Sequence, residues 1–394
     1  MTICPHDKCT GCYACANVCP KHCITMQEDE YGELHPEIDK NLCVNCGLCI
    51  KTCPHNLSLP FHKPKNCLAS WITNKEKRRI CASGGIATTL AEHVIKHHNG
   101  VVFGSRYDDN LKPVITYTTK LEELEHFKGS RYVQSVVGSE TFKQVKHFLR
   151  NEQMVLFIGT PCQIAGLYGY LKHDYENLIT VDLICHGVNP TLYFMEEVNK
   201  ICTKHNIANP KDVRFRGNDG HNYQFTIWDK ENICKYERRA YEQHYFAGFM
   251  LGVTLRENCF QCKYAKPERI ADITIGDFIG LGNKIPFPYE KNNVSSVTLN
   301  TEKGLNFYQN VSKNTPDLTN ITRTYEERLE YAPSLRVPYK RHPLNKVFRE
   351  NMKKYGYIKA SRKTLNLEIS KNIIRRKFYE YKKMIRYRLL NLFK

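Results

Sequence analysis

Two cysteine runs near the start of the chain limit its fold more strongly than any other feature. The runs are CTGCYACANVCP and CVNCGLCIKTCP, and both have the spacing C-x2-C-x2-C-x3-C-P. Three cysteines at positions i, i+3 and i+6 can wrap a tight loop around one cuboidal iron–sulfur cluster, and the fourth then leads toward a neighbouring cluster. The duplicated spacing therefore predicts two half-sites that exchange a ligand.

This spacing is typical of bacterial two-cluster ferredoxins, in which the fourth cysteine of each run ligates the cluster of the other run. We therefore expect two 4Fe–4S clusters. The first is predicted to use Cys9, Cys12, Cys15 and Cys53, and the second Cys43, Cys46, Cys49 and Cys19. Pro20 and Pro54 close the two runs, and the residues between the runs alternate around Tyr31-Gly32, which indicates a β-hairpin.

Zinc is the alternative metal, but its cysteine ligands usually come as two separated pairs, unlike this spacing. Cys4 and Cys23 lie near the runs but outside the pattern, so we expect them to be ordinary small residues. The chain has 18 cysteines, and its first residues lack the pattern of a signal peptide. We therefore expect metal binding in a reducing cytoplasm rather than disulfides.

The 394 residues predict two or three domains. No run of 18 apolar residues is present, so we expect no membrane-spanning helix. The net charge of +18 is uneven, because residues 340–394 contain 18 lysines and arginines and three glutamates, which leaves +3 for the rest. This distribution argues against nucleic-acid binding by the main body of the chain.

The basic C-terminal segment has the pattern of an amphipathic helix. Its apolar residues recur at steps of three or four and are Ile374, Phe378, Tyr381, Ile385, Leu389 and Leu392. Such a helix can bind the surface of an anionic membrane, or it can pack on its own domain with a solvated basic side. The spacing does not separate these two alternatives.

The middle of the chain predicts a β–α–β unit. MVLFIGTPCQIAGLYGYLKH indicates a buried strand, a sharp turn and a helix, and LITVDLICHG indicates the next buried strand. Strands joined in this way are parallel, so Cys162 and Cys185 are expected at the carboxyl edge of the sheet, where open α/β sheets place their sites. A later strand, ADITIGDF, ends at Asp277, whose carboxylate can contact a cofactor or cap the loop.

A single C-x-x-C in RENCFQCKYA supplies two further thiols, Cys259 and Cys262. With Cys162 and Cys185 they could complete a third four-cysteine cluster. Alternatively, Cys162 and Cys185 are buried small hydrophobes, and the C-x-x-C is a redox pair or half of a zinc site. The spacing alone leaves both interpretations open.

Two segments have features of anion or flavin contacts. Ser-Gly-Gly in CASGGIATTL precedes a helix, where free backbone N–H groups suit a phosphate or carboxylate, although Ser83 can also act as a plain N-cap. KGSRYVQSVVG suits a pyrophosphate or flavin but also an ordinary surface loop. Neither a G-x-G-x-x-G nor a Walker A motif is present.

In this order, ASGGIATTL, KGSRYVQS, GTPCQIAGL, DLICHGV, RENCFQCKYA and ADITIGDF resemble the beta subunit family of coenzyme F-420 hydrogenases and dehydrogenases, in the version with an N-terminal two-cluster ferredoxin domain. The resemblance covers roughly residues 1–345. It implies an α/β domain with FAD and a 4Fe–4S cluster held by Cys162, Cys185, Cys259 and Cys262. The implied flavin contacts are Ser83, Gly84, Gly85, Ser130, Arg131, Tyr132 and Gln134, with Asp277 as a further candidate.

The predicted fold class is α+β and α/β, with a partly parallel sheet in the main domain. The expected segments are a two-cluster ferredoxin domain at 1–62, a flavin-contacting part at 63–150, a third-cluster and catalytic part at 151–345, and a basic helical tail at 346–394. The resemblance implies an iron–sulfur flavoprotein oxidoreductase that passes electrons between ferredoxin-type clusters, FAD and a small molecule.

That small molecule is expected to be similar to coenzyme F-420 or to be a polysaccharide-biosynthesis intermediate, since bacterial members often accompany cell-surface polysaccharide synthesis. The expected partner is a ferredoxin or another redox protein, and no nucleic acid is expected. A non-catalytic electron-transfer subunit of a larger redox complex is the alternative function, and a zinc-stabilised nucleic-acid-binding protein is a third. The expected location is the cytoplasm, where the basic tail would allow contact with the inner face of the membrane.

Overall fold

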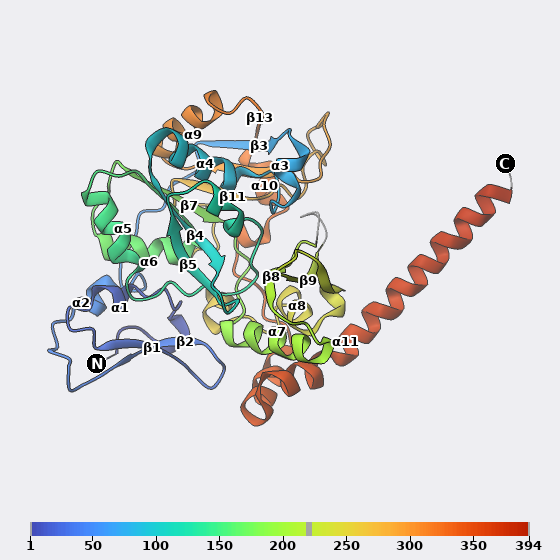
Figure 1. Cartoon of the computed structure of the whole chain (residues 1–394), viewed down its shortest axis with the longest axis horizontal. Helices are drawn as coiled ribbons and strands as arrows, with labels where there is room; N and C mark the ends of the chain where they lie inside the picture. The colour runs from blue at the N-terminus through green and yellow to red at the C-terminus, as the bar shows by residue number, and fades with distance from the viewer. Residues whose placement is uncertain (1, 218–222, 393–394) are drawn as a thin grey trace.

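The computed structural model describes residues 2–217 and 223–392, and side chains as far as residue 385. Figure 1 shows a large central sheet flanked by helices, a small N-terminal unit, a second small sheet, and a long C-terminal helix that projects from the body. The mixed α/β class with a partly parallel sheet, which the sequence predicts, is confirmed.

The N-terminal unit is built on the predicted hairpin. Strand β1 (Ile24–Glu28) pairs antiparallel with β2 (Leu34–Ile38), with Ile24 opposite Ile38. The short helices α1 (Ala14–Val18) and α2 (Leu48–Thr52) contact each other, and each begins inside one cysteine run. The hairpin expected around Tyr31-Gly32 is therefore confirmed.

Eight strands form the central sheet, in the order β13-β3-β12-β11-β7-β6-β4-β5. Their bounds are β3 (Asn66–Ile72), β4 (Val101–Tyr107), β5 (Pro113–Thr118), β6 (Val155–Gly159), β7 (Leu178–Leu183), β11 (Ile273–Asp277), β12 (Ser295–Leu299) and β13 (Leu318–Arg323). β4, β6, β7 and β11 are parallel, whereas the strands on either side pair antiparallel. The predicted β–α–β unit is confirmed as β6, helix α6 (Pro161–Leu171) and β7.

The parallel strands are covered on both faces, which explains their continuous apolar runs. Helix α5 (Thr141–Arg150) and α6 pack on one face, and α4 (Ile86–His98) and α9 (Glu302–Lys313) pack on the other. Helix α6 begins sharply because Pro161 occupies its first turn and Thr160 forms a capping box with Gln163. This start places Cys162 at the carboxyl edge of the sheet, as predicted.

A second, antiparallel sheet contains β8 (Pro210–Arg214), β9 (Gln224–Asp229) and β10 (Cys234–Arg239). It packs with α7 (Thr191–His205) and α8 (His244–Met250) around a separate, aromatic-rich core. Part of the C-terminal helix completes this core, so the second sheet is joined to the chain's last segment.

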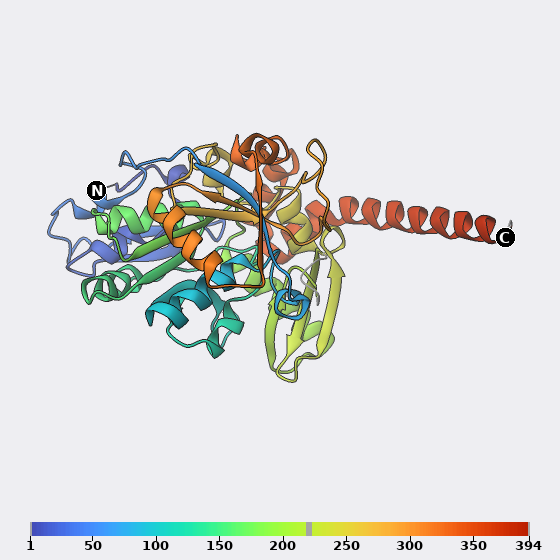
Figure 2. The same ribbon diagram turned by 90° about the horizontal axis from the view of Figure 1, so that it is seen from above.

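The C-terminal helix α11 (Leu344–Leu392) has one break, at Gly356, where φ is 70° and ψ is 173°. Just after the break, Tyr357, Ala360 and Leu365 are buried against α7 and α8. Farther along, the helix leaves the body, as Figures 1 and 2 both show. Its first part is therefore a core element, and its last part has few contacts with the body.

The predicted apolar stripe is exposed on this projecting part. Ile374, Phe378, Tyr381 and Ile385 are 39–67% exposed. The alternative in which this stripe packs on its own domain is therefore wrong for residues 374–385, whereas the side chains of Leu389 and Leu392 lie outside the described ones. Within 2–217 and 223–392, no helix is long and apolar enough to cross a bilayer. Contact with a membrane surface stays a prediction.

One buried guanidinium joins the N-terminal unit to the main body. Arg256 is 0% exposed and donates hydrogen bonds to the carbonyl oxygens of Cys9 (3.1 Å) and Leu34 (3.2 Å) in the N-terminal unit. It also donates to the side-chain oxygens of Gln134 (2.7 Å) and Asn258 (3.1 Å) in the main body. The four bonds involve all three nitrogens of the planar guanidinium, so lysine could not replace it.

Two further buried side chains of the N-terminal unit support the same interface. Glu33 accepts from the backbone N–H of Glu257 (3.0 Å) and forms an ion pair with Arg349 (2.9 Å). Asn17 accepts from the backbone N–H of Phe142 (2.9 Å). These directional contacts hold the N-terminal unit in one orientation on the main body.

Replacing Arg256 is expected to loosen the N-terminal unit. Arg256→Met removes the four hydrogen bonds and leaves buried carbonyl groups unpaired, at a cost of about 1–3 kcal/mol each. Amide hydrogen exchange in β1 and β2 should accelerate by about 100-fold, which corresponds to about 3 kcal/mol. Mass spectrometry of the purified holoprotein measures this exchange.

The control is Arg79→Met, because Arg79 in α3 (Lys75–Arg79) has a side chain that is 55% exposed. Its β1 and β2 amides should exchange at the unmodified rate. Equal exchange in the Arg256 and Arg79 variants would contradict the role assigned to Arg256.

Candidate functional site

A large cavity lies at the carboxyl edge of the parallel strands. Its volume is about 590 Å³, which is in the range of ligand and cofactor sites. The ends of β6, β7 and β11 form its base, and segments 81–88 and 127–135 contribute its walls. The predicted site residues that line it are Ser83, Gly85, Ser130, Arg131, Tyr132, Gln134, Asp277, Cys162, Cys185, Cys259 and Cys262.

Gly84 does not line the cavity, although its neighbours do. A Cβ at Gly84 would lie 2.3 Å from the carbonyl oxygen of Ser70, so the close approach to β3 requires glycine. Ser83, by contrast, has a buried hydroxyl with no hydrogen-bond partner among the described residues. Helix α4 begins after Gly85, so the alternative in which Ser83 simply caps this helix is wrong.

Four thiols meet at the cavity. Cys162 lies in the first turn of α6, Cys185 follows β7, and Cys259 and Cys262 come from the turn after Arg256. Burial raises the pKa of Cys162 to about 11 and the pKa of Cys185 to about 12. The pKa of Cys259 is raised well above its usual value, first by burial and then by the other three thiols. The four sulfurs would therefore repel one another as thiolates, a cost that bound metal ions remove.

Neighbouring groups hold these thiols in place. The backbone N–H of Gly187 donates to the Cys185 Sγ (3.4 Å), a contact of the kind that orients a thiolate ligand. Arg269 forms a buried ion pair with Asp182 (3.0 Å) and donates to the carbonyl oxygen of Tyr264 (3.2 Å). Arg269 thereby ties the turn that carries Cys259 and Cys262 to the sheet.

The eight cysteines of the N-terminal repeat gather in two groups. The first group is Cys9, Cys12, Cys15 and Cys53, and the second is Cys43, Cys46, Cys49 and Cys19. In the first group, burial raises the pKa of Cys15 and the other three thiols raise it further. In the second, burial raises the pKa of Cys49, with Cys46 and Cys19 adding to the effect. This arrangement suits the crossed ligand sets that the spacing predicts.

Two cysteines outside the repeat lie against these groups. Cys4 contacts Cys53 and Cys9, and these contacts raise its pKa. The Cys23 Sγ lies 3.3 Å from the Cys19 Sγ. The expectation that Cys4 and Cys23 are incidental is therefore revised, since each can donate a weak S–H hydrogen bond to a ligand sulfur. Their positions depend on how the chain closes around the repeat, which spacing does not show.

No motif marks Arg216, yet it organises the cavity wall beside Asp277. Its Nε donates to the Tyr132 hydroxyl (2.8 Å), and its Nη2 pairs with the Asp277 carboxylate. Tyr223 lies over the guanidinium, 4.4 Å from it. Asp277 is therefore half of an ion pair in the cavity wall, and its carboxylate makes no loop-capping hydrogen bond within the described part of the chain.

Two predicted flavin contacts have other polar partners. Gln134 accepts from Arg256 and donates to the carbonyl oxygen of Thr10 (3.2 Å), so its side chain also serves the N-terminal interface. Arg131 donates to the carbonyl oxygen of His126 (2.6 Å), while its Nε has no partner within the described part of the chain. Burial lowers the pKa of Arg131 from its usual value.

His186 is the single imidazole among the described residues that line the cavity. Its pKa is lowered, first by burial and then by the charge of Arg328. It is therefore neutral at pH 7 and can accept or donate a proton there.

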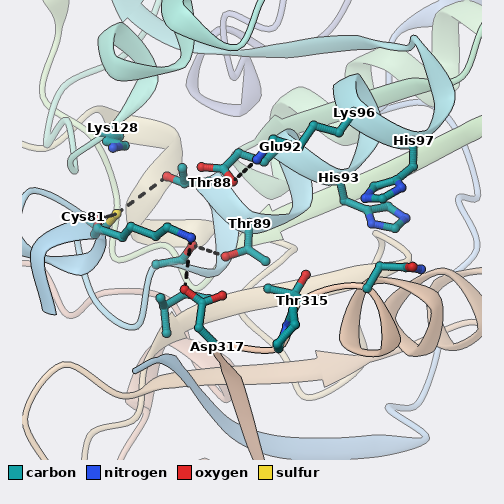
Figure 3. A pocket seen from close by; sticks show the side chains of 15 residues that line it. Cys81, Thr88, Thr89, Glu92, His93, Lys96, His97, Lys128, Thr315 and Asp317 are labelled. Carbon is teal, nitrogen blue, oxygen red and sulfur yellow. Dashed lines mark hydrogen bonds and ion pairs between the residues drawn. The ribbon is translucent and has the colours of Figure 1, made fainter. Parts of the chain in front are cut away.

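Figure 3 shows a second, smaller cavity of about 150 Å³ beside α4. Lys77 pairs with Asp317 (3.1 Å) and Lys96 pairs with Glu92 (3.0 Å), so its charges largely cancel. At one side lies His93, which is 3% exposed and stacks on His97 at 4.6 Å between ring centroids. Neither ring nitrogen of His93 has a hydrogen-bond partner in range among the described residues.

The charge state of His93 should make stability depend on pH. Burial, followed by His97 and His98, lowers the pKa of His93 from 6.5 to about 4. The unfolded chain takes up this proton near pH 6.5 and the folded chain only near pH 4, so stability falls as pH drops through this window. His93→Phe keeps the ring that packs on Phe307 and removes the proton site.

We therefore expect Tm to fall less steeply in His93→Phe than in the unmodified protein between pH 6.5 and 5.0, as measured by calorimetry. His173→Phe, at an exposed position outside α4, is the control and should keep the original slope. Identical slopes in all three proteins would show that His93 does not titrate as described.

The fold and the cysteine groups together define an α/β iron–sulfur protein of the electron-transfer class. Residues 152–322 match the family of coenzyme F-420 hydrogenase/dehydrogenase beta subunits at their C terminus, and residues 8–57 match a 4Fe–4S dicluster domain. The chain therefore contains a region that matches the C-terminal part of these beta subunits, and it carries a dicluster domain at its N-terminal side. The resemblance drawn from the motif order is confirmed.

Several curated proteins are similar to parts of the chain. An uncharacterized protein of Methanocaldococcus jannaschii is 24% identical over 204 residues, which are 44% of this chain and 55% of that protein. An uncharacterized ferredoxin of the same organism is 38% identical over 64 residues, 16% of this chain and 82% of the ferredoxin. NADH-quinone oxidoreductase subunit I 2 of Geobacter metallireducens is 43% identical over 53 residues, 12% of this chain and 40% of that subunit.

The chain thus spans less than half of that NADH-quinone oxidoreductase subunit. Among solved structures, a chain of the F-420-reducing [NiFe] hydrogenase complex from Methanosarcina barkeri has a TM-score of 0.45 and 17% identity. The superposition covers 78% of this chain and 94% of that one.

Proposed function

We propose that this chain is an iron–sulfur flavoprotein oxidoreductase. It passes electrons between two N-terminal 4Fe–4S clusters, a third 4Fe–4S cluster and FAD, and on to a small molecule. The observation that carries the proposal is the shared cavity, which is lined both by four thiols and by the segments expected to contact a flavin. A four-thiol set beside a cofactor-sized cavity suits a cluster that exchanges electrons with that cofactor.

Helix α6 supplies a short link between the N-terminal clusters and the cavity. A Cβ on Gly166 would lie 3.0 Å from the Cys12 Sγ, and a Cβ on Gly169 would lie 2.3 Å from the carbonyl oxygen of Thr52. The two glycines thus let both cysteine loops rest on the helix. Cys162 lies on the same face as Gly166, one turn or about 6 Å away along the axis. Cys12 and Cys162 therefore face the same short stretch of α6.

Tyr264 lies between the N-terminal cysteine group that contains Cys12 and the cavity group that contains Cys162. Its side chain is 4% exposed, and its hydroxyl has no hydrogen-bond partner among the described residues. The pKa of Tyr264 is raised well above its usual value, first by burial and then by Cys162 and Cys12. The ring therefore fills the space between the groups and excludes water, which keeps cluster potentials under the control of burial.

The proposed FAD site uses the segments 83–85 and 130–134. Helix α4 has 13 residues, and its free N–H groups beyond Gly85 suit a pyrophosphate. The unpartnered hydroxyl of Ser83 adds a donor beside them. When bound, the flavin exchanges electrons in pairs with a substrate and singly with clusters. The chain's own residues position the ligands, exclude water and hold an exchangeable proton at His186.

One observation favours a protein partner at the second N-terminal cluster. Leu42 and Val44, on either side of Cys43, are 54% and 58% exposed. Exposed apolar residues at a cluster loop suit a small, transient contact with a redox protein. We propose that a ferredoxin or another redox protein exchanges electrons here, which also fits a non-catalytic electron-transfer subunit.

Metal and flavin analysis tests the cofactor proposal. The anaerobically purified protein should contain about 12 iron atoms and about one FAD. Cys259→Ser or Cys262→Ser should lower the iron to about 8, because the third cluster loses a ligand. Cys202→Ser, outside all three cysteine groups, is the control and should keep full iron. Full iron in both Cys259 and Cys262 variants would refute the ligand set, and zinc without flavin would refute the whole proposal.

Reoxidation separates an enzyme from an electron-transfer subunit. Protein reduced with dithionite should be reoxidised by a small molecule such as coenzyme F-420 or a nucleotide-sugar intermediate, as followed by absorbance. Leu42→Glu with Val44→Glu should slow reduction by reduced ferredoxin about tenfold and leave reduction by dithionite unchanged. If only a protein partner reoxidises the chain, the hypothesis of an enzyme acting on a small molecule is wrong, and the chain is a non-catalytic electron-transfer subunit.

A further inference from the structure

Arg328 is a cation in the wall of the large cavity that has no ion-pair partner among the described residues. It lies on α10 (Tyr325–Glu330) and is 2% exposed. Its Nε and Nη1 have no hydrogen-bond partner among the described residues. Burial lowers the pKa of Arg328 to about 10, so the guanidinium still carries its charge at neutral pH. A buried charge without a counter-charge is costly, and an anionic ligand would remove that cost.

The carboxylates closest to Arg328 have other partners. Its sequence neighbour Glu327 forms a buried ion pair with Arg323 (2.6 Å). Asp277, whose charge also acts on Arg328, pairs with Arg216. Within the described residues, the chain therefore supplies no counter-ion for this guanidinium.

The cavity as a whole favours an anion. Asp277 is the one carboxylate among its described lining residues. The lining cations are Lys128, Arg131, Arg216, Arg269 and Arg328. Lys128, Arg216 and Arg269 pair with Glu125, Asp277 and Asp182, which leaves Arg131 and Arg328 without a carboxylate partner among the described residues. Such a lining concentrates anionic ligands and disfavours cationic ones.

Ser334 adds a neutral donor next to Arg328. It lies in the single-turn helix Pro333–Leu335, which contacts α10, and it lines the same cavity. Its buried hydroxyl has no hydrogen-bond partner in the described part of the chain. A charged fork on α10 and a hydroxyl on the adjoining single-turn helix thus line the same cavity.

We propose that Arg328 and Ser334 form an oxyanion subsite for the substrate, so that the small molecule exchanging electrons in this cavity carries a phosphate or carboxylate. This inference rests on the proposed function, in which FAD and substrate share the cavity. The N-terminus of α4 and Ser83 are available to the phosphates of FAD, which leaves the guanidinium of Arg328 for the second ligand. A guanidinium binds two oxygens of such a group at once.

Binding of small oxyanions to the FAD- and iron-loaded protein tests the subsite. The probes are inorganic phosphate and succinate, with Kd measured by calorimetry. For the tighter probe, Arg328→Gln should raise Kd at least about tenfold, equivalent to about 1.4 kcal/mol. Arg328→Lys keeps the charge but loses the two-pronged geometry of the guanidinium, so its Kd should lie between those of the unmodified protein and Arg328→Gln. Ser334→Ala should raise Kd about threefold.

A measurement on the unmodified protein covers the case in which a variant fails to fold. Phenylglyoxal modifies arginine, and phosphate should protect the peptide that contains Arg328 from this reaction. Equal Kd values in all variants, or no protection of that peptide, would overturn the subsite. Loss of FAD from Arg328→Gln with iron retained would assign Arg328 to the cofactor and overturn the substrate role. Failure of the proposed function would instead appear as absence of FAD from the unmodified protein.

Discussion

The buried guanidinium of Arg256 sets how the N-terminal cysteine groups meet the main cavity. It binds the carbonyl oxygen of Cys9 on one side and the side chain of Gln134 on the other, and it directly precedes the turn that carries Cys259. One side chain therefore contacts a candidate ligand of the first cluster and a residue of the segment proposed to bind a flavin, and it directly precedes the turn with two candidate ligands of the third cluster. Because sites that exchange electrons depend on positions held to fractions of an ångström, a rigid polar link suits this role better than an apolar one that could slide.

Helix α6 brings the N-terminal cysteine loops close to the thiols of the cavity. Its capping box fixes where the helix begins, which places Cys162 at the sheet edge. Its small residues Gly166 and Gly169 then let the cysteine loops of the N-terminal unit approach the helix backbone. A side chain at either position would push the N-terminal unit away from the helix. The start of α6 and its two glycines therefore have the same effect. They shorten the distance between the thiol group of Cys12 and the thiol group of Cys162.

The sequence alone predicts what depends on local spacing. The duplicated cysteine runs, the hairpin between them and the β–α–β unit follow from patterns of a few residues. The shared carboxyl edge of Cys162 and Cys185 follows from the parallel direction of the two strands that such a unit joins. These features are the ones that the structure and the family match bear out, whereas the third ligand set and the flavin contacts stay proposals.

The residues that spacing does not reveal act across the fold. Arg216 reaches the cavity from the second sheet, and Arg328 reaches it from the other end of the chain, so no local pattern joins either to the motifs they face. Cys4 and Cys23 lie against the cysteine groups only because the chain closes around them. Gly84 belongs to a predicted motif but faces the sheet, since the sequence does not show which side of a tight turn meets a neighbouring strand.

The cavity contains two sets of buried groups, thiols and a guanidinium, that need ligands of opposite charge. Cys162, Cys185, Cys259 and Cys262 are buried thiols that become compatible as thiolates only around metal ions, whereas Arg328 is a buried cation that requires an anion. The two sets of groups do not neutralise each other, because a thiol with a raised pKa carries no charge to balance a guanidinium. Ligands that satisfy both sets bind the folded state and not the unfolded one, so each contributes to stability in proportion to the logarithm of its concentration over its Kd. Folding of this domain is therefore coupled to binding of these ligands. The residues that would hold the cluster and the anion also lower the stability of the chain while those ligands are absent.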